Sequence, residues 1–255
     1  MLVPMGIINE YHEPTTFHGV ERPWVDSWLI PSTWRELGMG FQGFVPGRAI
    51  SFQTYLFNGL KGYQSAPLFS ADKGLRGGRQ KGSQTLASIP SWVGKLEWAG
   101  LRNTTVGAAL FVGPSETQVS DKNPWVLDST QVGLAMNTLD FRYASGPWAL
   151  RSQWTTTYLM QHSAYVARTG SSIGAWLTGG YAEAAYQLPV KSYPWWLFVR
   201  GSSWSTTAGQ FWNTAWTGGC SLFLHSGVVL KADVQRLGQG AKSEWSVNGG
   251  MGFWF

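Results

Sequence analysis

Apolar and polar residues alternate along most of this chain. In its last twelve residues one parity is apolar and the other is small or polar, the apolar positions being Trp245, Val247, Met251, Phe253 and Phe255. A period of two predicts a β-strand with one apolar face. The same alternation recurs in 49–57, 91–98, 148–160 and 228–236, where the charged residues other than Arg236 keep to the polar parity. The chain is therefore predicted to be all-β.

The pattern predicts twelve strands. They cover approximately 1–8, 34–45, 49–60, 91–99, 103–112, 130–144, 148–160, 172–187, 194–207, 213–226, 228–240 and 244–255. A change of apolar parity within 130–144, from Leu134 and Met136 to Leu139 and Phe141, predicts a β-bulge there. Because strand ends are the least certain part of such a prediction, the order and number of segments carry more weight.

Short and long connections alternate between these segments. Short turns rich in Gly, Pro and Ser fall near 46–48, 100–102, 145–147, 188–193 and 226–227, whereas long connections fall at 9–33, 61–90, 113–129 and 161–171. Two later connections on the long side, near 208–212 and 241–243, are shorter. Bacterial membrane barrels have short turns on one side and long loops on the other, and a sandwich has no reason to. We predict one domain, 1–255, folded as a transmembrane antiparallel up-and-down β-barrel with long extracellular loops near 9–33 and 61–90.

The composition favours a membrane barrel over a soluble sandwich. Charged residues make up 13% of the chain, against about a quarter in soluble domains. The chain contains 16 Trp and 32 Gly, its mean hydropathy is −0.12, and no stretch is apolar enough for a membrane helix. A sandwich with a solvated outer face shows the same alternation, so alternation alone leaves that alternative open.

The net charge of +5 indicates anions rather than nucleic acid as partners, because Lys and Arg are scattered singly. Strand parity turns several charged residues toward the predicted lumen: Lys95, Arg151, Arg200 and Lys231, with Glu97 and Asp233 on the same faces as possible neutralising groups. Strong phosphate selectivity is therefore not expected.

A second basic group is predicted in a Gly-rich loop. Arg76, Arg79 and Lys81 lie within six residues between Gly74 and Gly82. Folded into the lumen, the loop would place a positive field at a constriction. Facing outward, it would meet water or the phosphates of lipopolysaccharide. Both interpretations stand at this point.

No enzymatic or cofactor chemistry is predicted. His12, Glu13, His18 and Glu21 are close in sequence, but their spacing matches no closed set of metal ligands. Neither His162 nor His225 pairs with a strand serine as a hydrolase would require. The lone Cys220 excludes an internal disulfide.

Two segments carry a family resemblance. They are the stretch from Gly6 to Pro23, GIINEYHEPTTFHGVERP, continuing through IPSTWRELGMG at 30–40, and the loop GLRGGRQKG at 74–82. Together with the aromatic C-terminus they resemble outer-membrane porins of the phosphate-selective porin O and P superfamily.

The resemblance implies a water-filled barrel of about sixteen strands, a homotrimer, and loops folded into the lumen. It also implies location in the bacterial outer membrane, in contact with the lipid bilayer and lipopolysaccharide. Phe255, Phe253 and Met251 look like the terminal signal recognised by the barrel-assembly machinery. With twelve predicted strands, the chain is either an N-terminally shortened sequence of such a porin or a complete twelve-stranded barrel.

The function predicted from the sequence is passive diffusion of small hydrophilic solutes or ions, with at most a weak preference for anions. The alternative is a structural or adhesive outer-membrane protein with a plugged barrel. A barrel lipase is the least supported class.

Overall fold

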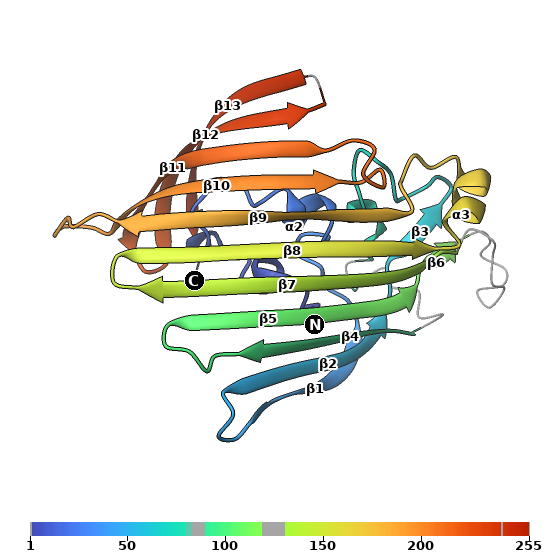
Figure 1. Cartoon of the computed structure of the whole chain (residues 1–255), viewed down its shortest axis with the longest axis horizontal. Coiled ribbons are helices and arrows are strands. Elements are labelled where there is room, and N and C mark those ends of the chain that lie inside the picture. The colour runs from blue at the N-terminus through green and yellow to red at the C-terminus, as the bar shows by residue number, and fades with distance from the viewer. Residues whose placement is uncertain (1, 81, 83–89, 119–130, 241, 255) are drawn as a thin grey trace.

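The computed structural model describes residues 2–80, 82, 90–118, 131–240 and 242–254. Its dominant element is one antiparallel sheet of eleven strands in which each strand pairs with its neighbours in the sheet order, β1-β2-β4-β5-β7-β8-β9-β10-β11-β12-β13 (Figure 1). These strands are β1 (Gly38–Val45), β2 (Ile50–Asn58), β4 (Pro90–Trp98), β5 (Thr104–Pro114), β7 (Gly133–Ser145), β8 (Trp148–Met160), β9 (Trp176–Gln187), β10 (Trp195–Ser205), β11 (Asn213–His225), β12 (Val228–Gln239) and β13 (Lys242–Phe253).

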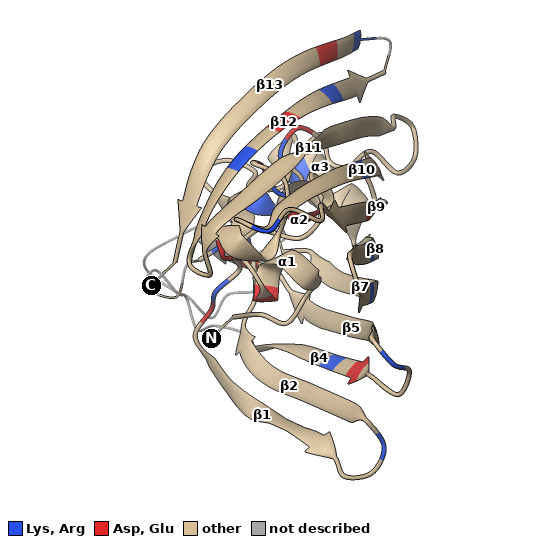
Figure 2. Cartoon of the chain, turned by 90° about the vertical axis from the view of Figure 1, so that its left-hand side faces the viewer, with Lys and Arg blue, Asp and Glu red and all other residues tan. Residues whose placement is uncertain are grey.

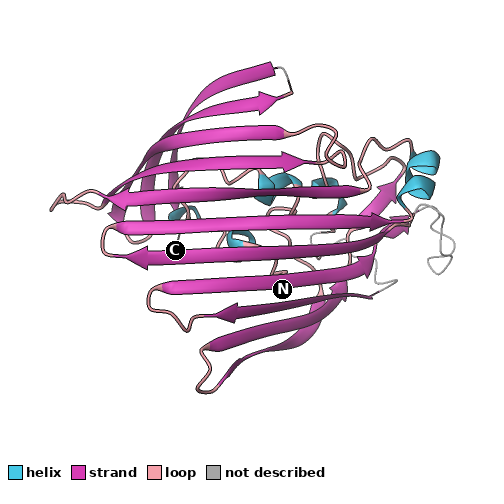
Figure 3. Cartoon of the chain, viewed as in Figure 1, coloured by secondary structure: helices cyan, strands magenta, loops and turns pink. Residues whose placement is uncertain are grey.

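Small elements accompany the sheet. A parallel pair, β3 (Lys61–Gln64) and β6 (Glu116–Gln118), lies at the end that carries the long connections. The helices are α1 (Ile7–Glu10), α2 (Val25–Trp28) and α3 (His162–Thr169), with 3-10 turns η1 (Pro14–Thr16) and η2 (Arg76–Gly78). Figure 3 shows how little helix stands against the sheet. No helix in the described part of the chain is long and apolar enough to span a bilayer.

The sheet is bent into an open arc. Residues 2–36, which include α1 and α2, lie on its hollow side (Figure 2). We call this stretch the inner segment and the side of the sheet that it covers the inner face. The edges of the arc are β1 and β13, and they do not pair with each other. An all-β antiparallel fold is therefore confirmed, while the predicted closed barrel is not seen.

Eleven of the twelve predicted strands form the sheet, and the prediction for 1–8 is wrong. Val3, Met5, Ile7 and Ile8 are all buried, so this stretch has no exposed parity. It packs inside the arc and turns into α1. The apolar side chains of this stretch pack into a core on all sides of it. Alternation between an apolar and a polar face is therefore not a guide to its structure.

The predicted bulge in 130–144 is also wrong. Strand β7 pairs with β5 and β8 in continuous register throughout. Leu134 and Met136 are fully buried beneath the inner segment, whereas Leu139 and Phe141 are exposed on the opposite face. The parity changes because the surroundings of the inner face change from an apolar core to a polar region, with no change in backbone register.

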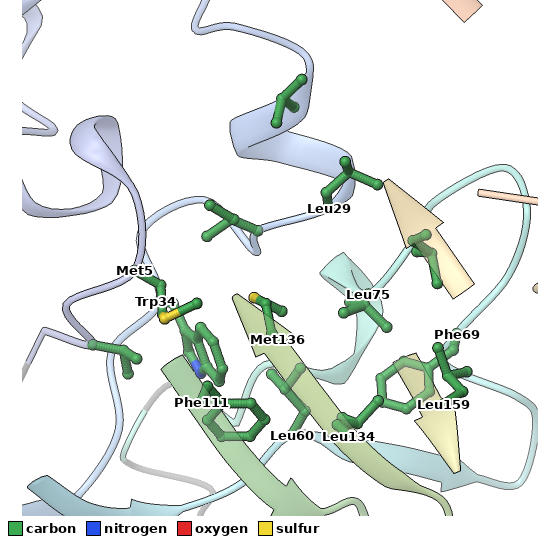
Figure 4. Close-up of a cluster of buried hydrophobic side chains, with 14 of the residues drawn as sticks. Met5, Leu29, Trp34, Leu60, Phe69, Leu75, Phe111, Leu134, Met136 and Leu159 are labelled. Atoms are coloured by element: carbon green, nitrogen blue, oxygen red, sulfur yellow. The ribbon is translucent and has the colours of Figure 1, made fainter. Parts of the chain in front are cut away.

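The core lies between the inner segment and one part of the sheet. Met5 and Trp34 from the inner segment meet Phe111 of β5 and Met136 of β7 (Figure 4). The Trp34 ring packs edge-on against Phe111, with 5.1 Å between centroids. Buried aromatic residues contribute large apolar areas and specific geometry. This packing fixes the inner segment to the sheet at the end where the long connections lie.

The outer face of the sheet is apolar and exposed. Leu139 in the middle of β7 is 60% exposed. Large side chains of the same parity on other strands are exposed as well, among them Trp92, Leu96, Trp154, Leu197, Val199, Trp216, Val234, Trp245 and Val247. Together these side chains expose more apolar surface than a soluble monomer normally presents, although Arg236 lies among them, opposite Trp216 and Trp245.

Candidate functional site

A row of charged residues crosses the inner face. Arg142 of β7 is opposite Arg151 of β8, which is opposite Glu183 of β9, which is opposite Arg200 of β10. Directly opposite residues project from the same face of a sheet. Glu183 is ion-paired with both Arg151 and Arg200, the latter at 3.3 Å between Nη1 and Oε2. We call Arg142, Arg151, Glu183 and Arg200 the charged row.

A second ionic cluster adjoins the row. Lys95 Nζ of β4 is paired with Glu10 of α1 and lies 3.2 Å from Glu97 Oε1 and 4.0 Å from Asp140 Oδ2. Glu97 is also paired with Arg142, which connects the cluster to the charged row. Buried charges are tolerated when they are paired and hydrogen-bonded. The buried charge of Lys95 is therefore compensated by these three carboxylates.

The sheet binds the backbone of residues 16–21. Lys231 Nζ donates to the carbonyl oxygens of Phe17 and Gly19, at 2.5 and 2.9 Å. Arg151 donates to Thr16 O, Ser221 to His18 O and Arg200 to Glu21 O. Val20 N–H donates to Asp233 Oδ2 at 2.7 Å. This set of contacts, which we call the clamp, fixes the middle of the inner segment across β8–β12.

Two further sheet residues, Gln153 and Gln53, anchor the segment on either side of the clamp. Gln153 of β8 accepts a hydrogen bond from Ile7 N–H at 2.7 Å and donates to Asp26 Oδ1 at 2.8 Å. Gln53 of β2 donates to Glu10 Oε1 at 2.7 Å. The inner segment is thus held to the sheet from β2 to β12 through side chains of one parity.

Burial shifts the titration of two residues of the inner segment. Desolvation lowers the pKa of His18 to about 4, against the opposing field of Glu183. Desolvation raises the pKa of Asp26 to about 6, although the hydrogen bond from Gln153 acts in the opposite direction. At neutral pH His18 is therefore uncharged within the charged row.

The structure brings together most of the predicted lumen residues but gives them partners. Lys95, Arg151, Arg200 and Lys231 all face inward as predicted. Each is engaged by a carboxylate or by a backbone carbonyl of the inner segment. Asp233 accepts from Val20 N–H and from Asn248 Nδ2, the latter at 2.8 Å. Their role as pore-lining charges stays a prediction.

The basic loop forms a separate pocket at the end with the long connections. Arg76 and Arg79 line a cavity of about 370 Å³ together with Lys61 and Lys73. Arg79 donates to Ser32 O and to Thr33 Oγ1 of the inner segment. Burial, reinforced by the nearby cations Arg76 and Arg22, lowers the pKa of Arg79. Lys81, the third predicted cation, lies outside the described residues.

The remaining predictions concern the terminal signal and metals. Met251 and Phe253 are exposed on β13, and Phe255 lies outside the described residues. A role in recognition by the assembly machinery stays a prediction. Among the residues that the structure describes, no group of three or more His, Cys, Asp or Glu side chains could hold a metal ion.

Several functional residues were not identified from the sequence. Glu183 is the only charged residue in β9. Its parity places it on the same face as Arg151 of the neighbouring strand, so the sequence does contain a signal for this ion pair. Gln153 and Ser221 gave none, because their partners are 146 and 203 residues away in the sequence. Glu10 was missed because residues 9–33 were interpreted as an extracellular loop rather than as a partner of the sheet.

Comparisons with known proteins add little to this site. No family model matches the chain. Over 112 residues, or 44% of its length, the chain is 37% identical to an uncharacterized protein of Aquifex aeolicus (strain VF5). That match covers 25% of the relative, so the chain spans about a quarter of the curated protein that it matches.

Replacing Lys231 with methionine should release the clamp. The carbonyls of Phe17 and Gly19 lose their charged donor, and an unsatisfied buried polar group costs about 1–3 kcal/mol. We expect amide hydrogen exchange in 16–21 to accelerate at least about tenfold, since about 1.4 kcal/mol is a factor of ten. Lys191→Met, at an exposed position in the β9–β10 turn, is the control. Unchanged exchange in Lys231→Met would show that the clamp does not hold the segment.

Replacing Asp26 with asparagine should remove a pH-dependent cost. The folded-state pKa of about 6 lies above the ordinary 3.8, so stability from this group is complete at low pH and is lost as pH rises from about 4 to 6. A gap of about two units corresponds to about 3 kcal/mol. Between pH 4 and 8 the unfolding free energy of Asp26→Asn should therefore gain about 2–3 kcal/mol relative to the wild type, in addition to any difference that does not depend on pH. If the difference in unfolding free energy between Asp26→Asn and the wild type does not change with pH, the pKa of Asp26 is not raised in the folded protein.

Proposed function

We propose that this chain forms the wall of a bacterial outer-membrane porin, through which small hydrophilic solutes or ions diffuse passively. The observation that carries the proposal is the distribution of residues over the two faces of the sheet. Ion-paired side chains are gathered on the inner face, and large apolar side chains are exposed on the outer face, where Arg236 of β12 is a charged exception beside Trp216 and Trp245. Membrane barrels have this inverted arrangement, because hydrocarbon surrounds the wall and water fills the interior.

Strand directions support closure by further strands. Every neighbouring pair in the sheet is antiparallel, so β1 and β13, the first and the eleventh, run in the same direction. Pairing them directly would create a parallel contact. Antiparallel closure therefore requires an odd number of additional strands. A total of twelve requires 12 − 11 = 1 and a total of sixteen requires 16 − 11 = 5, so both predicted barrel sizes satisfy this condition.

The inner segment supports a narrowed pore. It covers the middle of the inner face and uses Arg151, Arg200 and Lys231 as donors for its backbone. In the closed barrel that we propose, the water-filled path runs between this segment and the part of the wall that completes the arc. Because its principal wall cations are compensated, we propose no strong selectivity between anions and cations.

Other parts of the proposal come from the family resemblance. These are the homotrimer, contact with lipopolysaccharide, and recognition of the C-terminus by the barrel-assembly machinery. The outer face offers the apolar surface that lipid contact needs, and β13 presents Met251 and Phe253 on that face. No enzymatic activity and no cofactor are proposed.

A plugged structural or adhesive barrel is the second candidate. The extensive clamp favours it, because a segment bound by so many side chains of the wall obstructs part of the interior. The two candidates share the membrane-embedded wall and differ in whether ions pass through it.

The lipid-facing wall is tested by a charge placed on the outer face. In phospholipid vesicles Leu139→Arg should lower the unfolding free energy by about 2–4 kcal/mol, the cost of arginine near the bilayer midplane. Leu101→Arg is the matched control, since Leu101 is 58% exposed in the β4–β5 turn and should tolerate the change. Equal, small effects of the two substitutions would show that water wets the outer face.

Planar-bilayer conductance distinguishes the two candidates. For a porin we expect stable unit currents from the folded protein and, in a salt gradient, a reversal potential near zero. Swelling of liposomes in small neutral solutes provides a second readout. Folded protein that carries no current and supports no swelling would exclude the porin and favour the plugged barrel.

A further inference from the structure

Two adjoining cavities lie on the inner face near the short turns. One has a volume of about 480 Å³ and is bounded by residues from β1, β2 and β4, and the other has a volume of about 370 Å³ and is bounded by residues from β7, β8 and β9. Tyr11, Thr105 and Arg142 line both. Each volume falls in the range of about 300–1,000 Å³ that is usual for small-molecule sites.

Two exposed aromatic rings face the larger cavity. Phe44 of β1 is opposite Ser51 of β2, which is opposite Glu97 of β4, so Phe44 projects from the inner face like Glu97. It is 74% exposed, and Tyr11 of the inner segment is 44% exposed. The Arg142 guanidinium lies over one face of the Tyr11 ring, 5.3 Å from its centroid. Aromatic rings exposed in a polar interior offer flat apolar surfaces to a solute.

The charges that line the cavities cancel. Arg142 is paired with Glu97, and Arg151 is paired with Glu183. His18, which lines the smaller cavity, is uncharged at neutral pH because burial lowers its pKa to about 4. Such paired groups retain hydrogen-bonding capacity, since a guanidinium has five N–H donors and a carboxylate about four acceptor positions. They exert little net attraction on an ion.

The neighbouring part of the wall is polar and uncharged. Gln42, Ser51, Gln53 and Tyr55 occupy the inner parity of β1 and β2, and the Tyr55 hydroxyl donates to Gln42 Oε1 at 3.2 Å. Amide and hydroxyl groups beside flat aromatic rings match a solute that has hydroxyls at its rim and C–H bonds on its faces. A sugar ring has that combination, whereas an inorganic anion has no apolar face for the rings to contact.

We propose that these two cavities form a binding site for a small neutral polyhydroxylated solute, of the mono- or disaccharide class. Phe44 and Tyr11 contact its faces, and the Arg142–Glu97 and Arg151–Glu183 pairs bind its hydroxyls. If the site binds solutes on their way through the barrel, that role rests on the proposed porin function. As a binding site on the folded protein, it does not require that the barrel conduct.

The test measures binding to the folded full chain in detergent or lipid. A set of neutral probes (glucose, maltose, sucrose and cellobiose) is titrated by calorimetry, with inorganic phosphate and citrate as anionic probes. We expect at least one neutral saccharide to bind, and Phe44→Ala and Tyr11→Ala each to weaken that binding at least about fivefold. Tyr11→Phe, which keeps the ring, should retain affinity within about twofold.

Phe211→Ala is the matched control, because Phe211 is 65% exposed in the β10–β11 connection and lines neither cavity. Retained strand content in circular dichroism ensures that a loss of binding does not come from unfolding. Binding of the anions but none of the saccharides would overturn the inference, and so would saccharide binding that neither aromatic substitution weakens. In a protein that conducts ions, failure to bind any saccharide overturns this inference and leaves the porin intact. In a protein that binds saccharides without conducting, the porin fails and the site stands.

Discussion

The structure depends on the match between inward-facing charges of the sheet and the backbone of the inner segment. Arginine and lysine cannot be buried on a sheet face without partners, because the lost hydration exceeds any gain from packing. Here carboxylates such as Glu183 compensate part of the charge, and the carbonyl oxygens of residues 16–21 supply further acceptors. Conversely, that stretch has no strand or long helix of its own to satisfy its backbone. Each partner supplies the hydrogen bonds that the other lacks.

This dependence explains why the two faces of the sheet differ so strongly. With most of the charged side chains on one face, the other is left mainly with aromatic and aliphatic side chains, and Arg236 is a charged exception on it. A soluble sheet would cover them with a second layer, as sandwiches do. The described residues provide no such layer, and the polypeptide that could have formed one, residues 2–36, is bound to the opposite face. The outer face is thus left for an apolar surrounding, which a bilayer supplies in the porin that we propose.

Strand positions could be predicted from the sequence because strand parity is a local property. The sequence of β12 alone predicts that Leu230 faces outward and Lys231 inward, and the sequence of β4 does the same for Trp92 and Lys95. The inner segment could not be predicted in this way. Many of its apolar residues, such as Val3, Met5 and Ile8, are fully buried, and its polar contacts join residues up to 214 positions apart, as in the bond from Lys231 to Phe17. Parity indicated that Lys231 faces inward, but nothing local indicated that a backbone carbonyl would bind it.

In the proposed porin, the clamp also limits how solutes can be selected. Lys231 donates to two backbone carbonyls at 2.5 and 2.9 Å, which leaves at most one of its three N–H groups to bind a passing anion directly. Arg151 and Arg200 are restricted in the same way by Glu183 and by the inner segment. Selectivity therefore has to come from side chains outside the clamp. Of these, Phe44 and Tyr11 are exposed aromatic residues on the inner side of the arc, so shape and apolar contact become the means of discrimination. A wall whose charges are used for folding favours solutes that carry none.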